Sequence, residues 1–440
     1  MNTKLINLKD GGKLLYSPRK NAKAISVVFY FKAGAINDPS NKKGLAHFCE
    51  HAVFSFSTNN LDREQRLKIK QNLTINGATS LNRMIFYGVC VQEELEQMVD
   101  FFVDAFCNLK FEKDDFEKEK QIIVDEIKTR RKTNLAESFY STLPKIIKDK
   151  RGKAYSNSAA GDESSVQKIK PQDLKEFMEK FLTLNNLCMA VSGNVSKKDL
   201  KMIINKVSAM PSSQRKGLSV DDLEGINKPF FDFVPAVEKK QDLVTLYYKI
   251  NPEIVGDDFA QDKQLEILRT TLSKMLFEFF REKKNFCYSA NASYDRISNI
   301  NFLKMSLPTQ TENTKKLLEC YSEFLQSLTK ENLQEKFEIA KKNKINFTNF
   351  DVLQILDLSV INIENFVSYK KLGGDKLNKE TEDVYKSVQF EKIYDMIKQT
   401  LSSKPYLSIV SNDETLKDFD YKAFTKNLNK MGEKDENKIN

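Results

Sequence analysis

The chain has 440 residues, of which 40% are hydrophobic and 30% are charged, and its net charge is +9 at neutral pH. This length favours two domains of about 200 residues, and the composition is that of a globular protein rather than a disordered one. No stretch approaches about 18 uninterrupted apolar residues, so the sequence predicts no membrane span. Lysine and glutamate are interleaved without a long basic block, so we expect no nucleic-acid binding.

The N-terminal residues and the cysteines bear on the compartment. The first ten residues contain neither an apolar signal core nor an Arg-rich presequence. The six cysteines are scattered and form no C-x-x-C pair, which is typical of reduced, buried thiols. We therefore expect a cytoplasmic protein.

Strands and helices follow one another along the first half of the chain. Short β-rich runs bounded by turn residues predict strands, and longer runs with helical spacing predict helices. The expected strands are 14–16, 25–33, 78–91 and 187–194, and the expected helices are 45–54, 62–76, 93–108 and 114–132.

The second half repeats this scheme, and the strand near the chain end resembles the strand at 187–194. The repetition predicts an α+β fold of two similar α/β-sandwich domains that arose by internal duplication. A polar segment with Pro and Gly at 210–217 is the best linker, so we place the domains at 1–212 and 225–435. The expected elements are strands 243–250, 286–293, 301–307 and 406–412, and helices 257–280 and 313–328.

Both histidines of the chain, His47 and His51, lie in one H-x-x-E-H motif with Glu50. Residues four apart on a helix share a face, so both imidazoles can bind one metal ion. Glu50 lies beside that ion, where its carboxylate could take a proton from water. A histidine pair at this spacing can also be a core pair without a metal, but histidine occurs nowhere else in the chain, which favours the ligand pair.

A catalytic zinc site needs a third protein ligand. No third histidine exists, and a cysteine would favour a closed structural site. Glu119 and Glu126 lie seven residues apart on one face of the expected helix at 114–132. From spacing alone, either can be a ligand or both can be solvated carboxylates.

The run from Asp38 to His51 resembles the start of the pitrilysin/insulinase family of inverzincin zinc metallopeptidases, in its mitochondrial-processing-peptidase-like branch. The resemblance implies one zinc ion per chain, held by His47, His51 and Glu126. It also implies that Glu119 supports the ligand histidines from outside the metal centre.

The resemblance continues at 276–289, where Arg281 and Tyr288 stand seven residues apart. In the family these positions bind the substrate and the developing oxyanion. Asn82 is similarly implied to contact the substrate. The family works as a clamshell of four such domains, so this chain would be half of one. A homodimer is implied, or a heterodimer with a related subunit.

The motif and the resemblance together predict a zinc endopeptidase with Glu50 as the catalytic base, and the resemblance implies that Arg281 and Tyr288 are also catalytic. It would cut short or unfolded peptides inside a closed chamber, and the peptide would add as a strand to the edge at 78–91. Two alternatives remain. One is a dedicated peptidase that matures a leader peptide or precursor, and the other is a non-catalytic, peptide-holding member of the family.

Overall fold

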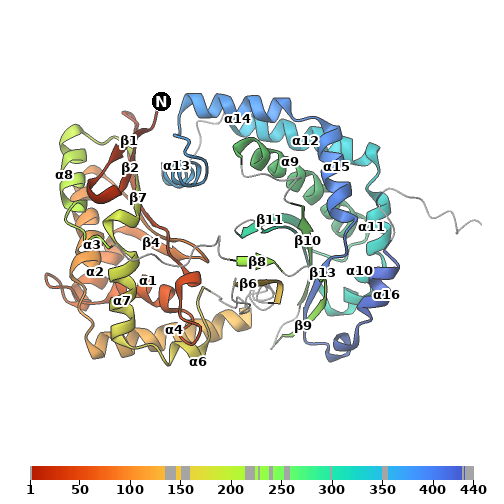
Figure 1. Ribbon diagram of the computed structural model, residues 1–440, viewed down its shortest axis with the longest axis horizontal. Helices are drawn as coiled ribbons and strands as arrows, with labels where there is room; N and C mark the ends of the chain where they lie inside the picture. The colour runs from red at the N-terminus through yellow and green to blue at the C-terminus, as the bar shows by residue number, and fades with distance from the viewer. Residues whose placement is uncertain are drawn as a thin grey trace, which may run out of the picture. The chain divides into compact units, whose positions relative to one another are not determined.

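The computed structural model divides into two compact units (Figure 1). The first comprises Met1–Thr129, Asn157–Val220 and Phe350–Asn378, and the second Arg130–Ser156, Asp221–Asn349 and Lys379–Asn440. The domain limits of 1–212 and 225–435 stay predictions, because a division by packing does not test where the duplicated segments begin. The structure describes residues 2–133, 145–149, 159–213, 223–225, 228–236, 241–251, 258–297, 300–348, 355–428 and 431.

The first unit is built on a six-stranded sheet with the order β1-β2-β7-β3-β5-β4, so β4 is an edge strand. Strands β2 and β7 run parallel, and the other neighbours are antiparallel. The strands are β1 (Lys4–Asn7), β2 (Lys13–Pro18), β3 (Ile25–Phe31), β4 (Thr74–Thr79), β5 (Met84–Cys90) and β7 (Leu187–Gly193).

Both faces of this sheet are covered, which explains why all seven residues of β3 are buried. Side chains alternate along a strand. Phe29 therefore packs into the main core with α1, α3 and α8, while Val28 and Tyr30 pack against α13 on the other face (Figure 1). Helix α13 comes from far along the chain and was not predicted. The helices here are α1 (Leu45–Ser55), α2 (Arg63–Asn72), α3 (Leu95–Asn108), α4 (Lys113–Thr133), α6 (Glu163–Val166), α7 (Pro171–Phe181), α8 (Lys197–Val207) and α13 (Ile355–Tyr369), with short helices η1 (Lys9–Gly11), η2 (Ala35–Asn37), η3 (Gln92–Glu94) and η4 (Leu184–Asn186).

The second unit has a five-stranded sheet that repeats five of the six strands of the first sheet, and β1 has no counterpart among its described strands. Its order is β11-β12-β10-β13-β9, with β9 and β13 parallel and the other pairs antiparallel. Strands β9, β13, β10, β12 and β11 thus take the places of β2, β7, β3, β5 and β4. The predicted duplication of an α+β unit is confirmed. The strands are β9 (Phe231–Pro235), β10 (Gln241–Ile250), β11 (Asn291–Ile297), β12 (Ile300–Gln310) and β13 (Tyr406–Ser411), and a separate pair is β6 (Ile147–Asp149) with β8 (Leu223–Gly225).

A second hydrophobic core lies between this sheet and its helices. Among the described residues, no helix is both long enough and apolar enough to cross a bilayer. The helices are α9 (Phe259–Leu276), η6 (Phe277–Lys283), η7 (Thr311–Asn313), α10 (Thr314–Glu319), α11 (Tyr321–Ser327), α12 (Lys330–Thr348), α14 (Asp375–Ser387), α15 (Phe390–Leu401), η8 (Glu414–Asp418) and α16 (Tyr421–Lys426).

Two predicted elements differ from the structure in a way that matters for the site. The predicted helix at 62–76 corresponds to α2, which already ends at Asn72. In place of one predicted strand at 78–91, the structure has a hairpin of β4 and β5. Residues 80–83 form the turn between these strands. Residues from Thr74 to Thr79 alternate between exposed and half-buried, which is typical of a strand. The prediction of a helix up to residue 76 was therefore wrong at its end.

Glu266 of α9 joins three helices of the second unit through one carboxylate. It accepts hydrogen bonds from Lys263 at 2.5 Å, from Lys344 of α12 at 2.7 Å and from the Tyr385 hydroxyl of α14 at 2.8 Å. Burial alone would raise the pKa of Glu266, but the two lysines lower the pKa to about 2. The carboxylate is therefore charged at all physiological pH values.

We predict that Glu266→Gln lowers the free energy of unfolding by about 1–3 kcal/mol at pH 7, because Lys344 loses its counter-charge and Lys263 keeps only Asp262, at 3.4 Å. The folded-state pKa is below that of the unfolded chain. The contribution is therefore present above about pH 4.5 and is lost as the pH falls towards 2. Urea unfolding at pH 7 and at pH 3 measures both effects.

The matched control is Glu391→Gln, because Glu391 forms a solvent-exposed pair with Lys330 at 3.0 Å. That change should leave the free energy of unfolding nearly unchanged, because water screens an exposed pair. Equal effects of the two substitutions would contradict the assigned role of Glu266.

Candidate metal centre

The H-x-x-E-H motif lies on α1, and the start of this helix is fixed by a buried carboxylate. Asp38 accepts hydrogen bonds from the backbone N–H groups of Gly44 at 2.7 Å and Ala46 at 2.9 Å, which satisfies donors of the first turn. Gly44 has a φ of 90°, and a Cβ there would lie 2.5 Å from the carbonyl oxygen of Ala160. Glycine is therefore required at this helix start.

The structure brings together the three residues predicted to bind zinc. The Nε2 atoms of His47 and His51 lie 3.8 and 3.3 Å from Oε2 of Glu126. The ligand atoms of all three residues lie within 4.8 Å of one another. Zinc–ligand bonds of about 2.0–2.1 Å at tetrahedral angles place two ligand atoms about 3.3–3.4 Å apart. Two imidazoles and one carboxylate at these distances fit a zinc ion and leave its fourth position for substrate.

Glu119 and Arg63 hold His51 from the side away from Glu126. The Nδ1 atom of His51 lies 2.8 Å from Oε1 of Glu119, and Arg63 donates to Oε2 of Glu119 at 2.7 Å. Arg63 also donates to the carbonyl oxygen of Ser55 at 3.2 Å, at the end of α1. With Nδ1 held by a carboxylate, the ring presents Nε2 to the metal position.

Both members of the His51–Glu119 pair have displaced pKa values. Burial favours neutral His51, but its hydrogen bonds with Glu119 and Glu126 outweigh burial and raise the pKa to about 9. Burial likewise favours neutral Glu119, yet hydrogen bonds with His51, Arg63 and Ser55 lower the pKa to about 2. Glu119 is thus a fixed negative charge behind the histidine.

Glu50 is positioned by the edge strand β4. The Thr79 hydroxyl donates to Oε2 of Glu50 at 2.6 Å. Gly77, two residues earlier, packs directly against the same side chain, since a Cβ there would lie 3.2 Å from Oε1 of Glu50 and 2.8 Å from the Phe54 ring. A larger residue would displace Glu50 or the strand, so Gly77 allows the edge strand to approach the candidate base.

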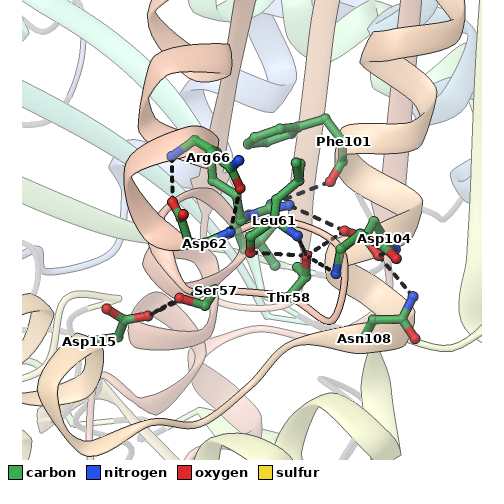
Figure 2. A network of polar contacts seen from close by, with 12 residues as sticks. Ser57, Thr58, Leu61, Asp62, Arg66, Phe101, Asp104, Asn108 and Asp115 are labelled. Carbon is green, nitrogen blue, oxygen red and sulfur yellow. Dashed lines mark hydrogen bonds and ion pairs between the residues drawn. The ribbon is translucent and has the colours of Figure 1, made fainter.

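The loop that follows α1 is anchored by carboxylates from α3 and α4 (Figure 2). Asp115 of α4 accepts from the backbone N–H and the hydroxyl of Ser57, at 3.0 and 2.7 Å. Asp104 of α3 accepts from the Thr58 hydroxyl at 2.6 Å and lies 3.9 Å from the buried Arg66. Asp115 is one helical turn before Glu119, so its hydrogen bonds with Ser57 help to hold α4 against the end of α1.

Arg281 and Tyr288 lie in the second unit and are close to each other. The Arg281 guanidinium carbon is 5.5 Å from the centre of the Tyr288 ring, and Arg281 donates to the side chain of Asn285 at 3.0 Å. Tyr288 is 80% exposed. The pair is therefore available at the surface of this unit, and its catalytic role stays a prediction.

Asn82 lies exposed in the turn between β4 and β5, not on the edge strand, and its substrate contact stays a prediction. Sequence reasoning also missed three residues that position the site, namely Arg63, Thr79 and Asp115. Recognising β4 as a strand would have indicated Thr79, because its alternation places Thr79 on the same face as Gly77. No sequence signal indicates Arg63 or Asp115, whose partners are distant in the chain.

Two family models match successive parts of the chain. Residues 14–155 match the insulinase (peptidase family M16) domain, and residues 168–344 match the peptidase M16 inactive domain. The chain belongs to the M16 peptidase family. The predicted resemblance is thereby confirmed, and the family indicates a zinc-dependent metallopeptidase.

Individual relatives agree with the family. The chain is 22% identical to an uncharacterised zinc protease of Bacillus subtilis, YmxG, over 74% of this chain and 79% of YmxG. It is 23% identical to the beta subunit of the mitochondrial-processing peptidase of Lentinula edodes, over 58% of this chain and 54% of that one. These M16 relatives are named for zinc or for peptide processing.

A solved M16 structure shares the fold. The chain matches the periplasmic protease PqqL from Escherichia coli with a TM-score of 0.77 at 14% identity, over 98% of this chain and 50% of PqqL. The first half of PqqL alone is matched over 97% of its length, with a TM-score of 0.74. The chain therefore has the fold of half of PqqL, which confirms the predicted half-clamshell fold.

We predict that Glu126→Gln abolishes stoichiometric zinc binding, because one of three protein ligands is lost. Glu119→Gln and Arg63→Ala should each lower zinc affinity about 10- to 100-fold, because His51 loses its support. Competition with a chromophoric chelator measures these affinities.

Glu117→Gln is the matched control on the same helix, since Glu117 is exposed and pairs with Lys120. It should bind zinc as the unaltered protein does. Zinc affinity that is unchanged in Glu119→Gln would contradict the role given to the His51–Glu119 hydrogen bond.

Proposed function

We propose that the protein is a zinc endopeptidase that cuts short or unfolded peptides inside a closed chamber. One observation carries the proposal, namely that Glu50 lies on the same helix as His47 and His51 and is held against the edge strand by Thr79. The candidate base therefore lies between the two histidines of α1 and an edge strand to which a peptide could add, and Glu126 of α4 would complete the ligand set.

His47, His51 and Glu126 would hold the zinc ion. When bound, zinc polarises the scissile carbonyl and acidifies water at the site. Glu50 takes the proton of the attacking water and delivers it to the leaving amine. The hydrogen bond from Thr79 engages Oε2 of Glu50, which fixes the orientation of the carboxylate.

The substrate would add to β4 as an extended strand. β4 is an edge strand, and edge strands present unpaired backbone groups to an incoming chain. The Gly77 N–H is hydrogen-bonded at 2.8 Å to the side chain of its neighbour Asn76, and a peptide carbonyl can take the place of that amide. Pairing through the main chain gives affinity with little sequence preference.

Arg281 and Tyr288 would stabilise the oxyanion and fix the peptide. We propose that they act on the metal centre of a second chain in a homodimer. Two findings support a pairing of two chains that each have this fold. This chain covers only 50% of PqqL, whose chain is therefore about twice as long as the matched fold, and the Lentinula relative is named a subunit. A heterodimer with a related subunit is the alternative arrangement.

We also propose a cytoplasmic location. All six cysteines are free thiols, and five of them are buried. Burial raises the pKa of Cys90 and of Cys287 to about 12. These thiols are therefore unreactive core residues, as is usual in a reducing compartment.

The role of Glu50 is tested by Glu50→Gln, which should keep zinc and peptide affinity but lower kcat by several orders of magnitude, because only the base is removed. Cleavage of a mixed peptide library, read by mass spectrometry, measures turnover. Chelation of zinc should abolish cleavage by the unaltered protein. Normal turnover by Glu50→Gln would show that another group is the base.

The homodimer is tested by mixing two inactive variants. His47→Ala loses the metal, and Arg281→Ala with Tyr288→Phe loses oxyanion stabilisation. In a mixed dimer one composite site carries both defects and the other carries none. With half of the dimers mixed, roughly a quarter of the activity should return under two-fold symmetry.

Demonstrated exchange of subunits is the control for this mixing experiment, for example by co-purification of two differently tagged chains. Exchange without recovery of activity would mean that each chain completes its own site or that the Arg281 and Tyr288 roles are wrong.

A further inference from the structure

Ile122 is an apolar side chain that is exposed beside the metal centre. It lies on α4 and is 48% exposed, whereas Glu119, three residues earlier, is only 5% exposed. Glu126, four residues later, has a side chain that is 27% exposed. Ile122 is therefore more exposed to solvent than either of the two glutamates next to it on this helix.

The helical spacing places Ile122 next to both glutamates. Side chains three and four residues apart on a helix are neighbours, with Cβ atoms about 5–6 Å apart. Glu126 contributes to the metal centre and Glu119 holds His51. A substrate carbonyl at the metal would therefore bring one of the two side chains that flank the scissile bond towards Ile122, since neighbouring side chains of an extended peptide point to opposite sides.

The chemistry of Ile122 differs from that of the surface around it. Between residues 113 and 129 of α4, every other exposed side chain is polar or charged. A polar side chain would serve equally well on a helix face that contacts only water. Burial of the Ile122 side chain against an apolar group of the substrate would be favourable. These polar residues are Lys113, Asp114, Glu117, Lys118, Gln121, Asp125, Lys128 and Thr129.

We propose that Ile122 is a specificity-determining residue, which contacts the side chain of one of the two residues flanking the scissile bond and favours an apolar one there. The inference rests on the proposed endopeptidase function. It adds a side-chain preference to binding that is otherwise through the peptide main chain.

The test uses peptides that the unaltered protein cuts at one mapped bond. Leu and Asn, which are similar in shape, are exchanged at each of the two flanking positions. At one of these positions the unaltered protein should prefer Leu, by the ratio of kcat/KM values. Ile122→Ser should reduce that ratio about 5- to 10-fold. This effect is smaller than the substrate discrimination that an enclosed apolar pocket can provide. Ile122→Val should stay within about 2-fold of the original ratio.

Peptide binding gives a second readout without turnover. In the Glu50→Gln background, Ile122→Ser should lower the affinity for the Leu peptide relative to the affinity for the Asn peptide by a similar factor. Zinc content should be unchanged in every Ile122 variant.

Val91→Ser is the matched control. Val91 is 47% exposed and lies just beyond β5. It is at the far end of the β4–β5 pair from Thr79, which pairs with Met84 and contacts Glu50. This substitution should leave the Leu-to-Asn ratio unchanged.

The outcomes separate this inference from the proposed function. If the unaltered protein shows no zinc-dependent cleavage of any peptide, the endopeptidase proposal fails and this inference fails with it. If the protein cleaves but Ile122→Ser alters both peptides equally or neither, the specificity role is wrong while the endopeptidase remains. Loss of zinc in Ile122→Ser and Ile122→Val would overturn the inference in favour of a structural role.

Discussion

A hydrogen bond between two side chains helps to join the two helices that carry the metal ligands. It links His51 of α1 to Glu119 of α4 at 2.8 Å. Arg63 extends it to the end of α1 through the Ser55 carbonyl. Glu126 is two turns further along the same α4, so its distance from the histidines depends on how α4 lies against α1. Glu50 depends on the same helix pair, because it shares α1. The histidine and glutamate side chains of the candidate metal centre and the candidate base are therefore positioned by contacts among α1, α2, α4 and β4.

The duplicated fold uses equivalent positions for different purposes. In the first unit α1, which lies between β3 and β4, carries the metal motif, and Glu50 contacts Thr79 on the edge strand. In the second unit the helix between β10 and β11 is α9. Its Ser273 exchanges hydrogen bonds with both the N–H and the carbonyl of Ala292 on β11, at 3.0 and 3.1 Å. The chain has no histidine in this half. Among the described residues, the one group of side chains that could hold a metal ion lies in the first unit, and the match of 168–344 to an M16 inactive domain agrees with this.

Local patterns in the sequence predict the parts of the site that lie close together in the chain. The spacing of His47, Glu50 and His51 follows the helical repeat, so the motif alone predicts that both imidazoles share one helix face. The pairing of Glu126 with these histidines needed a family resemblance, because spacing on α4 alone could not tell Glu119 from Glu126. Arg63 and Asp115 could not be predicted, since their partners depend on how α2 and α4 pack. The β4–β5 hairpin was missed because a short, half-exposed edge strand next to a helix has only a weak signal.

The central claim is that two imidazoles and one carboxylate hold zinc on α1 and α4. X-ray absorption at the zinc edge of the zinc-loaded protein tests it most directly, because nitrogen or oxygen ligands at about 2.0–2.2 Å are distinct from sulfur at about 2.3 Å. The account predicts two imidazole nitrogens, oxygen in the remaining positions and no sulfur, because the buried Cys49 thiol contacts the Leu174 carbonyl at 3.8 Å. A sulfur ligand, or a spectrum with one imidazole, would contradict it.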